Sequence, residues 1–295
     1  MFKQLLLFLL LTVAGFSAHS VLLQVLGSGG PEIGDKRASS SYIVWIDGRS
    51  RILVDFGGGA LLRFEESNAR IEDIDMILLT HLHIDHTSDL PALMKASFFT
   101  GRSHDILLYG PEGNRVMPGT KTFIKRLFED KKGAWQYMGD YLDGRASFQL
   151  KTKNVDRSRK VQTLYRKGDI TIQAVTVHHG PIPAVAYRVN AGKKSITFTG
   201  DMNGAYHTVE ALAYRTDLLV AHNAVPKGAK GTATVLHMTP DSIGRIAAES
   251  KAGSLVLSHR MLRTLGKEKE TKREIRKYYM GPIVFANDKS IYTVK

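Results

Sequence analysis

The first third of the chain alternates short apolar runs with glycine-containing turns. These runs predict strands at Val21 to Leu26, Ser41 to Ile46, Arg51 to Asp55 and Asp75 to Thr80. Asp47-Gly48 fits a two-residue hairpin turn between the second and third strands, and the fourth is apolar on both faces, which indicates burial. A helical pattern follows from Leu90 to Phe99, so residues 81 to 89 are predicted to form a strand-to-helix loop.

The rest of the chain continues this alternation of strand-like runs and amphipathic stretches. Helices are predicted at 119 to 142, Pro240 to Glu249 and Lys267 to Tyr279, and strands at Thr171 to Val177, Val185 to Val189, Ser195 to Thr199, Asp217 to Ala221, Leu255 to Leu257 and Ile283 to Ala286. The stretch from Lys151 to Lys167 carries seven basic residues against one Asp, which suits a solvated loop or an edge strand. Residues 21 to 295 are therefore predicted to form one α/β domain, a four-layer αβ/βα sandwich of two sheets covered by helices.

The first twenty residues have a different pattern. Lys3 precedes an apolar run from Leu5 to Phe16, and the small residues Ala18 and Ser20 follow, which is the order of a secretory signal peptide. The run is about twelve residues long, whereas a membrane span needs roughly twenty, so an uncleaved anchor is the weaker alternative. Cleavage after Ser20 predicts a periplasmic or secreted protein with no membrane attachment.

Two features of the composition restrict the chemistry. The chain contains no cysteine, so disulfides and thiolate ligands are excluded and any metal must be held by His, Asp or Glu. The formal net charge is +13, and it falls to +12 if residues 1 to 20, with Lys3, are removed. A positive charge of this size favours anionic substrates through long-range attraction. A small anionic molecule is expected as the substrate, with nucleotides as one candidate class.

The clearest chemical motif is a histidine cluster in the loop after the buried strand. His81, His83, Asp85 and His86 lie within six residues. Imidazoles and a carboxylate are the ligands that Zn²⁺ takes when no thiolate is present. Alternation along an extended segment points His81 and His83 at one metal, while Asp85 and His86 lie beyond the turn and face a second. The motif therefore predicts two neighbouring metal sites.

Three further residues of ligand type each follow a predicted strand. They are His179, Asp201 and His259, and strand ends are where α/β sheets place their chemistry. A strand-end Asp, the HxHxDH motif, a later His, an Asp and a final His occur here in the order that resembles the metallo-β-lactamase superfamily. The segments Leu26 to Gly30, Arg37 to Ser41 and His179 to Arg188 are most similar to its ribonuclease Z and class II cyclic-nucleotide phosphodiesterase branch.

The resemblance implies a role for each of these residues. His81, His83 and His179 resemble the ligands of a first zinc, Asp85, His86 and His259 those of a second, Asp201 the carboxylate that bridges them, and Asp55 a support of the metal loop. It also implies two zinc ions per chain, hydrolysis by a metal-bridging hydroxide that Asp85 orients, and a homodimer.

One further histidine resembles a catalytic residue of the phosphodiesterase branch. His237, in Leu236-His-Met-Thr-Pro240, resembles the histidine that contacts the substrate there, and it would bind the phosphate or protonate the leaving oxygen. The alternative is a structural residue at the start of a helix.

Two departures separate the chain from ribonuclease Z. Tyr187-Arg188 runs almost directly into Ser195, which leaves no room for a tRNA-gripping arm, and Ala221-His222-Asn223-Ala224 replaces a His-Glu-Ala-Thr segment and so lacks its acidic residue. Together with the predicted export, these departures argue against a stable nucleic-acid partner.

The other histidines and the early glycines are assigned more modest roles. We interpret His19, His104 and His207 as surface residues or as core residues whose ring nitrogens are hydrogen-bonded. His178 is interpreted as a packing or supporting residue on the strand face opposite His179. The role of His222 stays open between the site and the structure. The cluster of Gly27, Gly29 and Gly30 suits a tight turn better than a phosphate loop.

Phosphodiester hydrolysis is the function that these patterns favour. Attack on a carbonyl, as in a lactonase, another carboxylic or sulfuric ester hydrolase, or a β-lactamase, is the alternative, because the same hydroxide would serve. The expected bridging Asp201 argues against β-lactamase. A non-catalytic member of the fold is disfavoured because all seven candidate ligands are present.

Overall fold

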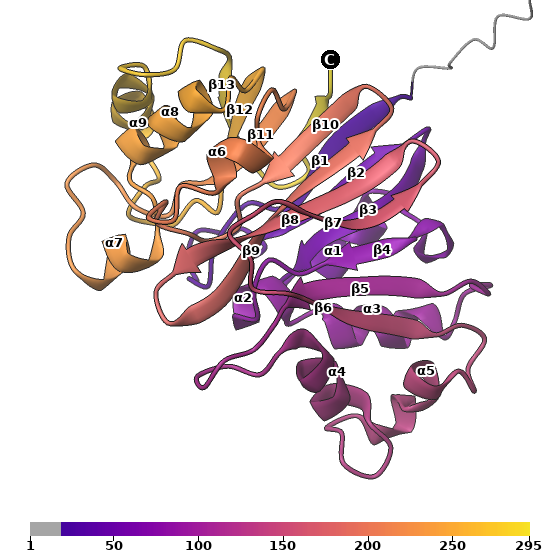
Figure 1. Cartoon of the computed structure of the whole chain (residues 1–295). Helices are drawn as coiled ribbons and strands as arrows, with labels where there is room; N and C mark the ends of the chain where they lie inside the picture. The colour runs from indigo at the N-terminus through magenta and orange to yellow at the C-terminus, as the bar shows by residue number, and fades with distance from the viewer. Residues whose placement is uncertain (1–18) are drawn as a thin grey trace, which may run out of the picture.

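Two mixed sheets of seven strands, packed face to face, form the centre of the computed structural model, which describes residues 19–295 (Figure 1). The first sheet contains, in spatial order, β14 (Ile291–Thr293), β1 (Val21–Gly27), β2 (Ser41–Ile46), β3 (Arg49–Phe56), β4 (Met76–Leu78), β5 (Ile106–Pro111) and β6 (Leu150–Val155). The second contains β13 (Ile283–Phe285), β12 (Ser254–Ser258), β11 (Leu218–His222), β10 (Lys194–Phe198), β9 (Ile182–Ala191), β8 (Ile170–His179) and β7 (Gln162–Lys167).

Helices cover the outer face of each sheet. Beside the first sheet lie α1 (Ala60–Glu66), η1 (Ile71–Asp73), α2 (Ile84–Thr87), α3 (Leu90–Ser97), α4 (Thr120–Phe128), η2 (Gln136–Met138) and α5 (Asp140–Asp143). Beside the second lie α6 (Val209–Leu212), α7 (Thr232–Leu236), α8 (Pro240–Glu249) and α9 (Glu268–Ile275). The predicted four-layer sandwich of the α/β class is confirmed.

Because successive side chains of a strand point to opposite faces, the buried residues of the sandwich form three separate cores. In β4, Met76 and Leu78 pack between the sheets, whereas Ile77 packs under the helices of the first sheet. In β12, Val256 faces the inter-sheet core and Leu255 faces the helices of the second sheet. Because successive strand side chains point to opposite faces, strands covered on both sides must be apolar throughout, as the sequence of β4 indicated.

Parallel strands bring the candidate ligands to one edge of the sandwich. β3, β4, β5 and β6 run parallel, and so do β10, β11, β12 and β13. The carboxyl ends of parallel strands meet at one sheet edge. Loops that follow β4, β10 and β12 therefore emerge together, and these loops carry the histidine cluster, Asp201 and His259.

Several predicted elements need correction. The single helix predicted at 119 to 142 is wrong: α4 ends at Phe128, and an irregular segment precedes η2 and α5. Lys131 adopts a left-handed φ of 70°, which no helix interior accommodates. The helix predicted to reach Tyr279 ends at Ile275. The basic stretch from Lys151 to Lys167 is confirmed as edge strands, since β6 and β7 close one edge of each sheet.

The signal-peptide prediction concerns residues 1 to 20, of which 1 to 18 lie outside the described residues. The described part contains no helix long and apolar enough to cross a membrane. His19 Nδ1 lies 2.6 Å from an Asp47 carboxylate oxygen and its Nε2 lies 2.7 Å from one of Asp169, so this side chain links a turn of each sheet. These two carboxylates raise the pKa of His19.

Candidate metal centre

Asp55 fixes the loop that carries the histidine cluster. Its carboxylate accepts hydrogen bonds from the backbone N–H of Thr80 at 2.7 Å and from the Thr80 hydroxyl at 2.8 Å. The same carboxylate accepts from Nδ1 of His86 at 2.8 Å. His86 must therefore present Nε2 to the centre, and this buried atom has no hydrogen-bond partner. The structure thus gives Asp55 the supporting position that the resemblance implied.

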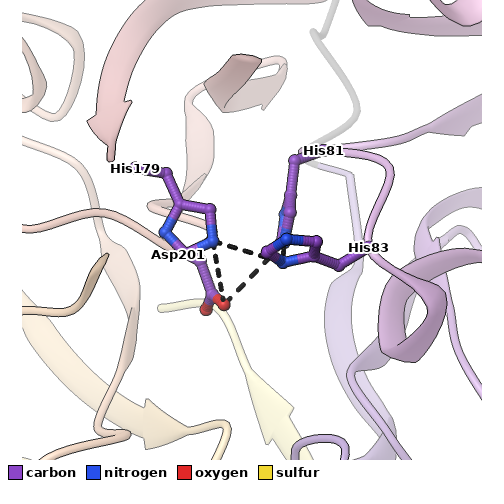
Figure 2. A group of neighbouring side chains, drawn as sticks. All are labelled: His81, His83, His179 and Asp201. Atoms are coloured by element: carbon purple, nitrogen blue, oxygen red, sulfur yellow. Dashed lines mark hydrogen bonds and ion pairs between the residues drawn. The ribbon is translucent and has the colours of Figure 1, made fainter. Parts of the chain in front are cut away.

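The first group of candidate ligands is His81, His83, His179 and Asp201, whose ligand atoms all lie within 4.8 Å of one another. Figure 2 shows His81 and His83 from the loop after β4 facing His179 at the end of β8. Nδ1 of His83 lies 3.0 Å from Nε2 of His81 and 3.3 Å from Nε2 of His179. The two sheets together therefore hold three imidazole nitrogens around one point.

The second group lies beside the first. His86, Asp201, His222 and His259 place one ligand atom each within 4.8 Å of one another. Asp85 adjoins this group, with Oδ2 3.2 Å from Nε2 of His259 and 3.5 Å from Nε2 of His86. His86, Asp201 and His259 are therefore joined by a fourth candidate ligand, which is either Asp85 or His222.

The hydrogen bonds of His222 distinguish these two residues. Its Nδ1 donates to Oδ1 of Asp201 at 2.7 Å, and its Nε2 accepts from the Tyr42 hydroxyl at 3.0 Å. Both ring nitrogens are thus occupied by protein partners, so we infer that His222 orients Asp201 and leaves Asp85 to face the metal. Sequence reasoning left the role of His222 open and did not identify Tyr42, because neither contact follows from spacing along the chain.

Asp201 lies between the two groups. Its Oδ2 is 3.8 Å from Nε2 of His81, His179 and His86 alike, and 3.4 Å from Nε2 of His259. One carboxylate oxygen therefore faces histidines of both groups, which is the position of a bridging ligand.

The donor set fits two zinc ions. Zinc bonds of about 2.0–2.2 Å to nitrogen and oxygen imply ligand-to-ligand separations of about 3.4 Å in a tetrahedron. Several pairs here lie 3.0 to 3.8 Å apart, and all ligand atoms of a group lie within 4.8 Å of one another. The ligands are imidazole and carboxylate, the types that zinc takes in a protein without cysteine. The buried Nε2 of His86 without a partner points to a ligand outside the protein, since buried polar atoms are ordinarily bonded.

Burial and neighbouring charges set the protonation of these residues. Burial lowers the pKa of His81, His83 and His179, which keeps these imidazoles neutral and able to ligate. Burial opposes ionisation of Asp201, but the surrounding histidines outweigh it and hold the pKa of Asp201 well below its usual range. At His86 burial is likewise outweighed, here by Asp85 and Asp55, and the pKa rises. Protons therefore compete with metal more strongly at the second group.

His237 lies at the boundary of the two groups without belonging to either. Its ring centroid is 5.5 Å from that of His179 and 5.6 Å from that of His259, and its Nδ1 is 3.7 Å from Oδ2 of Asp201. This Nδ1 is buried and has no hydrogen-bond partner, and burial lowers the pKa of His237 to about 3. A neutral imidazole in this position is suited to contact a molecule bound beside the metals.

The remaining predicted residues lie outside the centre. His178 points away from His179 and packs edge-on against Tyr206, with ring centroids 5.0 Å apart. His104 and His207 are exposed. Gly30 lies against the His259 ring, where a Cβ would come within 2.7 Å of Cε1, so glycine is required by close approach rather than by phosphate binding.

Replacing Asp55 with alanine is expected to lower the free energy of unfolding by about 2 to 5 kcal/mol, because Thr80 N–H and His86 Nδ1 lose their buried acceptor. Alanine is also strained at the left-handed φ of 54° found here. Denaturant unfolding of metal-free protein measures the change. Asp55→Asn is the matched control, because asparagine tolerates this φ and keeps one acceptor oxygen. Equal stability of Asp55→Ala and the parent chain would contradict the supporting role.

Comparisons with known proteins identify the family of this chain. Residues 50–260 match the family described as the Beta-lactamase superfamily domain. A ribonuclease Z of Enterococcus faecalis is 25% identical over 283 residues, covering 83% of this chain and 88% of that protein. The crystal structure of the short form of human tRNase Z has a TM-score of 0.71 at 21% identity and covers 93% of this chain and 99% of its own. Unliganded yeast PDE1 has a TM-score of 0.68 at 14% identity, covering 94% and 100%.

Proposed function

This chain belongs to the metallo-β-lactamase superfamily and is a metal-dependent hydrolase, and from this we propose that it is an exported phosphodiesterase with two zinc ions. The observation that carries the substrate class is the position of His237, which lies beside both candidate metal groups in a segment that resembles the phosphodiesterase branch. The ribonuclease Z relative that aligns over most of the chain supports the same class.

Zinc, when bound, supplies an activated water near neutral pH and offsets negative charge on the attacked phosphate. The protein residues supply orientation. Asp85, ionised because the neighbouring His86 and His259 hold its pKa low against the effect of burial, presents an acceptor oxygen for the proton of the attacking water. His237, whose Nδ1 lies 3.7 Å from Oδ2 of Asp201, offers a ring N–H to a phosphate oxygen.

Hydrolysis of a lactone, a carboxylic or sulfuric ester, or a β-lactam by the same centre is the second candidate, because an activated water also attacks a carbonyl. The net charge, +12 after removal of residues 1 to 20, favours an anionic phosphodiester over a neutral lactone or carboxylic ester. Sulfate esters and many β-lactams are also anionic, so against them the preference rests on the resemblance of the His237 segment to the phosphodiesterase branch. The substrate proposed is a small anionic molecule, and the protein is expected to act without a stable nucleic-acid partner.

Purified protein reconstituted with zinc is expected to bind about two zinc ions per chain and to hydrolyse phosphodiesters faster than phosphomonoesters, lactones, sulfate esters or β-lactams. One substrate panel with elemental analysis on the same sample measures both properties. His81→Ala, which removes a candidate ligand, should lose metal and hydrolysis together. A fully metallated protein that hydrolyses lactones but no phosphodiester would overturn the assignment.

Export is proposed from the order of Lys3, the apolar run and the small residues Ala18 and Ser20. The mature chain is expected to begin at Val21, the first residue of β1. Cleavage there removes the His19 contacts with Asp47 and Asp169, which are partly exposed ion pairs of small expected value. Intact-mass measurement of protein from a periplasmic or secreted fraction checks the position, and a soluble cytoplasmic form that retains Met1 would contradict export.

A further inference from the structure

Five exposed apolar side chains lie on segments that contact residues of the metal centre or their immediate neighbours. They are Ile33, Ile84, Val116, Val235 and Leu262, exposed by 92%, 73%, 60%, 46% and 48%, and together they are called the apolar collar. Each belongs to a different loop or short helix of the described chain.

Contacts with metal-centre residues place three of the collar segments on the side of the second group. Ile84 stands between His83 and Asp85 in the metal loop. The backbone N–H of Leu262, three residues after His259, donates to the Glu32 carboxylate at 2.7 Å. This bond holds the Ile33 loop beside the same histidine, and Gly30 of that loop already packs on the His259 ring.

The other two segments lie on the side of His179. Val235 precedes Leu236, whose carbonyl accepts a hydrogen bond from Nδ1 of His179 at 2.8 Å. Val116 lies in the loop after β5, where the Asn114 amide donates to the carbonyl of Pro181, two residues beyond His179, at 2.8 Å. In Figure 1, α7, the tip of the β8–β9 hairpin and the loop after β5 lie on the same side of the molecule.

Single exposed apolar residues are ordinary on protein surfaces, but a group of them around one site indicates a binding surface. The collar segments adjoin a centre whose side chains are polar and which, with zinc bound, would suit an anion. A substrate that binds both the metal centre and the apolar collar is an anion with an apolar substituent. We propose that the collar binds an alkyl or aryl group that the substrate carries on its phosphodiester, so that the preferred substrates are amphiphilic phosphodiesters.

This inference rests on the proposed phosphodiesterase function and specifies which ester group the collar contacts. In the reaction, water adds to phosphorus, the bond to the leaving oxygen breaks, and that oxygen departs as an alcohol with the proton from water. The second ester group stays on the phosphate product. The collar would contact this retained group, and His237 would contact the phosphate.

The test compares methyl p-nitrophenyl phosphate with octyl p-nitrophenyl phosphate below its micelle concentration, on zinc-loaded protein. The leaving group is the same, so only the retained group differs. We expect kcat/KM to be on the order of 10-fold higher for the octyl ester, since several methylenes leave water. The double variant Ile33→Ser/Ile84→Ser should bring this ratio towards 1. The control Leu62→Ser/Ile291→Ser removes two apolar residues of α1 and β14 that are 56% and 57% exposed, and it should keep the ratio.

Each alternative result has a distinct meaning. Equal kcat/KM for the two esters would overturn the collar as a substrate contact and leave the phosphodiesterase intact, whereas hydrolysis of neither ester by fully metallated protein would overturn both. A ratio that the collar variant leaves unchanged, while a dimer dissociates in sedimentation, would assign the collar to a contact between copies and overturn the inference. Metal analysis of Ile33→Ser/Ile84→Ser must show the parent content, because Ile84 adjoins two candidate ligands.

Discussion

Replacing Asp201 with alanine is expected to remove metal from both groups at once and to abolish hydrolysis. Oδ2 of Asp201 lies within 3.8 Å of histidines in each group, and among residues 19–295 Asp201 is the one side chain that belongs to both groups. Loss of an outer-shell partner typically costs 10- to 100-fold in metal affinity, and loss of a bridging ligand should cost at least on the order of 10²-fold at each site. The same change removes the acceptor of His222.

Elemental analysis after dialysis against low zinc, with competition against a chelator, measures the two affinities. His259→Ala is the informative comparison, because His259 belongs only to the second group and should leave the first metal bound. His104→Ala, at an exposed histidine remote from the centre, controls for a general effect of histidine loss. Circular dichroism verifies that each variant folds. Two tightly bound metals in Asp201→Ala would refute the bridging position.

The histidine cluster could be placed from sequence because its geometry is local. His81 and His83 follow a strand whose burial on both faces was visible in the run from Asp75 to Thr80, and alternation determined which pair shares a site. The later residues His179 and Asp201 were found because each follows a strand-like run. These predictions depend on where strands end and on the alternation of side chains along them, and both can be recognised in the sequence.

Features that depend on contacts between distant segments could not be predicted in this way. The bond from His222 to Asp201 and its partner Tyr42 join β11, the loop after β10 and β2, and spacing along the chain carries no sign of it. β14 was missed because it is only three residues long, and β5 because it contains Gly110-Pro111, a pair typical of turns. The break after α4 was missed because the left-handed Lys131 occurs in a stretch whose composition still suits a helix.

Replacement of His237 is expected to have the second large effect on hydrolysis. His237→Ala is expected to lower kcat for phosphodiesters by on the order of 10² to 10³ while zinc content stays at the parent level. Zinc is retained because His237 belongs to neither metal group, although its Nδ1 lies 3.7 Å from Asp201. A ligand variant such as His81→Ala would instead lose metal and activity together.

The leaving group distinguishes the two roles open to His237. A general acid matters most when the leaving oxygen is a strong base, so its loss would be partly masked with p-nitrophenolate. Burial lowers the pKa of His237 to about 3, which keeps the ring neutral at pH 7 and favours hydrogen bonding to a phosphate oxygen over proton transfer. The defect should therefore be similar for alkyl and p-nitrophenyl leaving groups. A defect that shrinks steeply as the leaving group improves would assign proton donation to His237 instead.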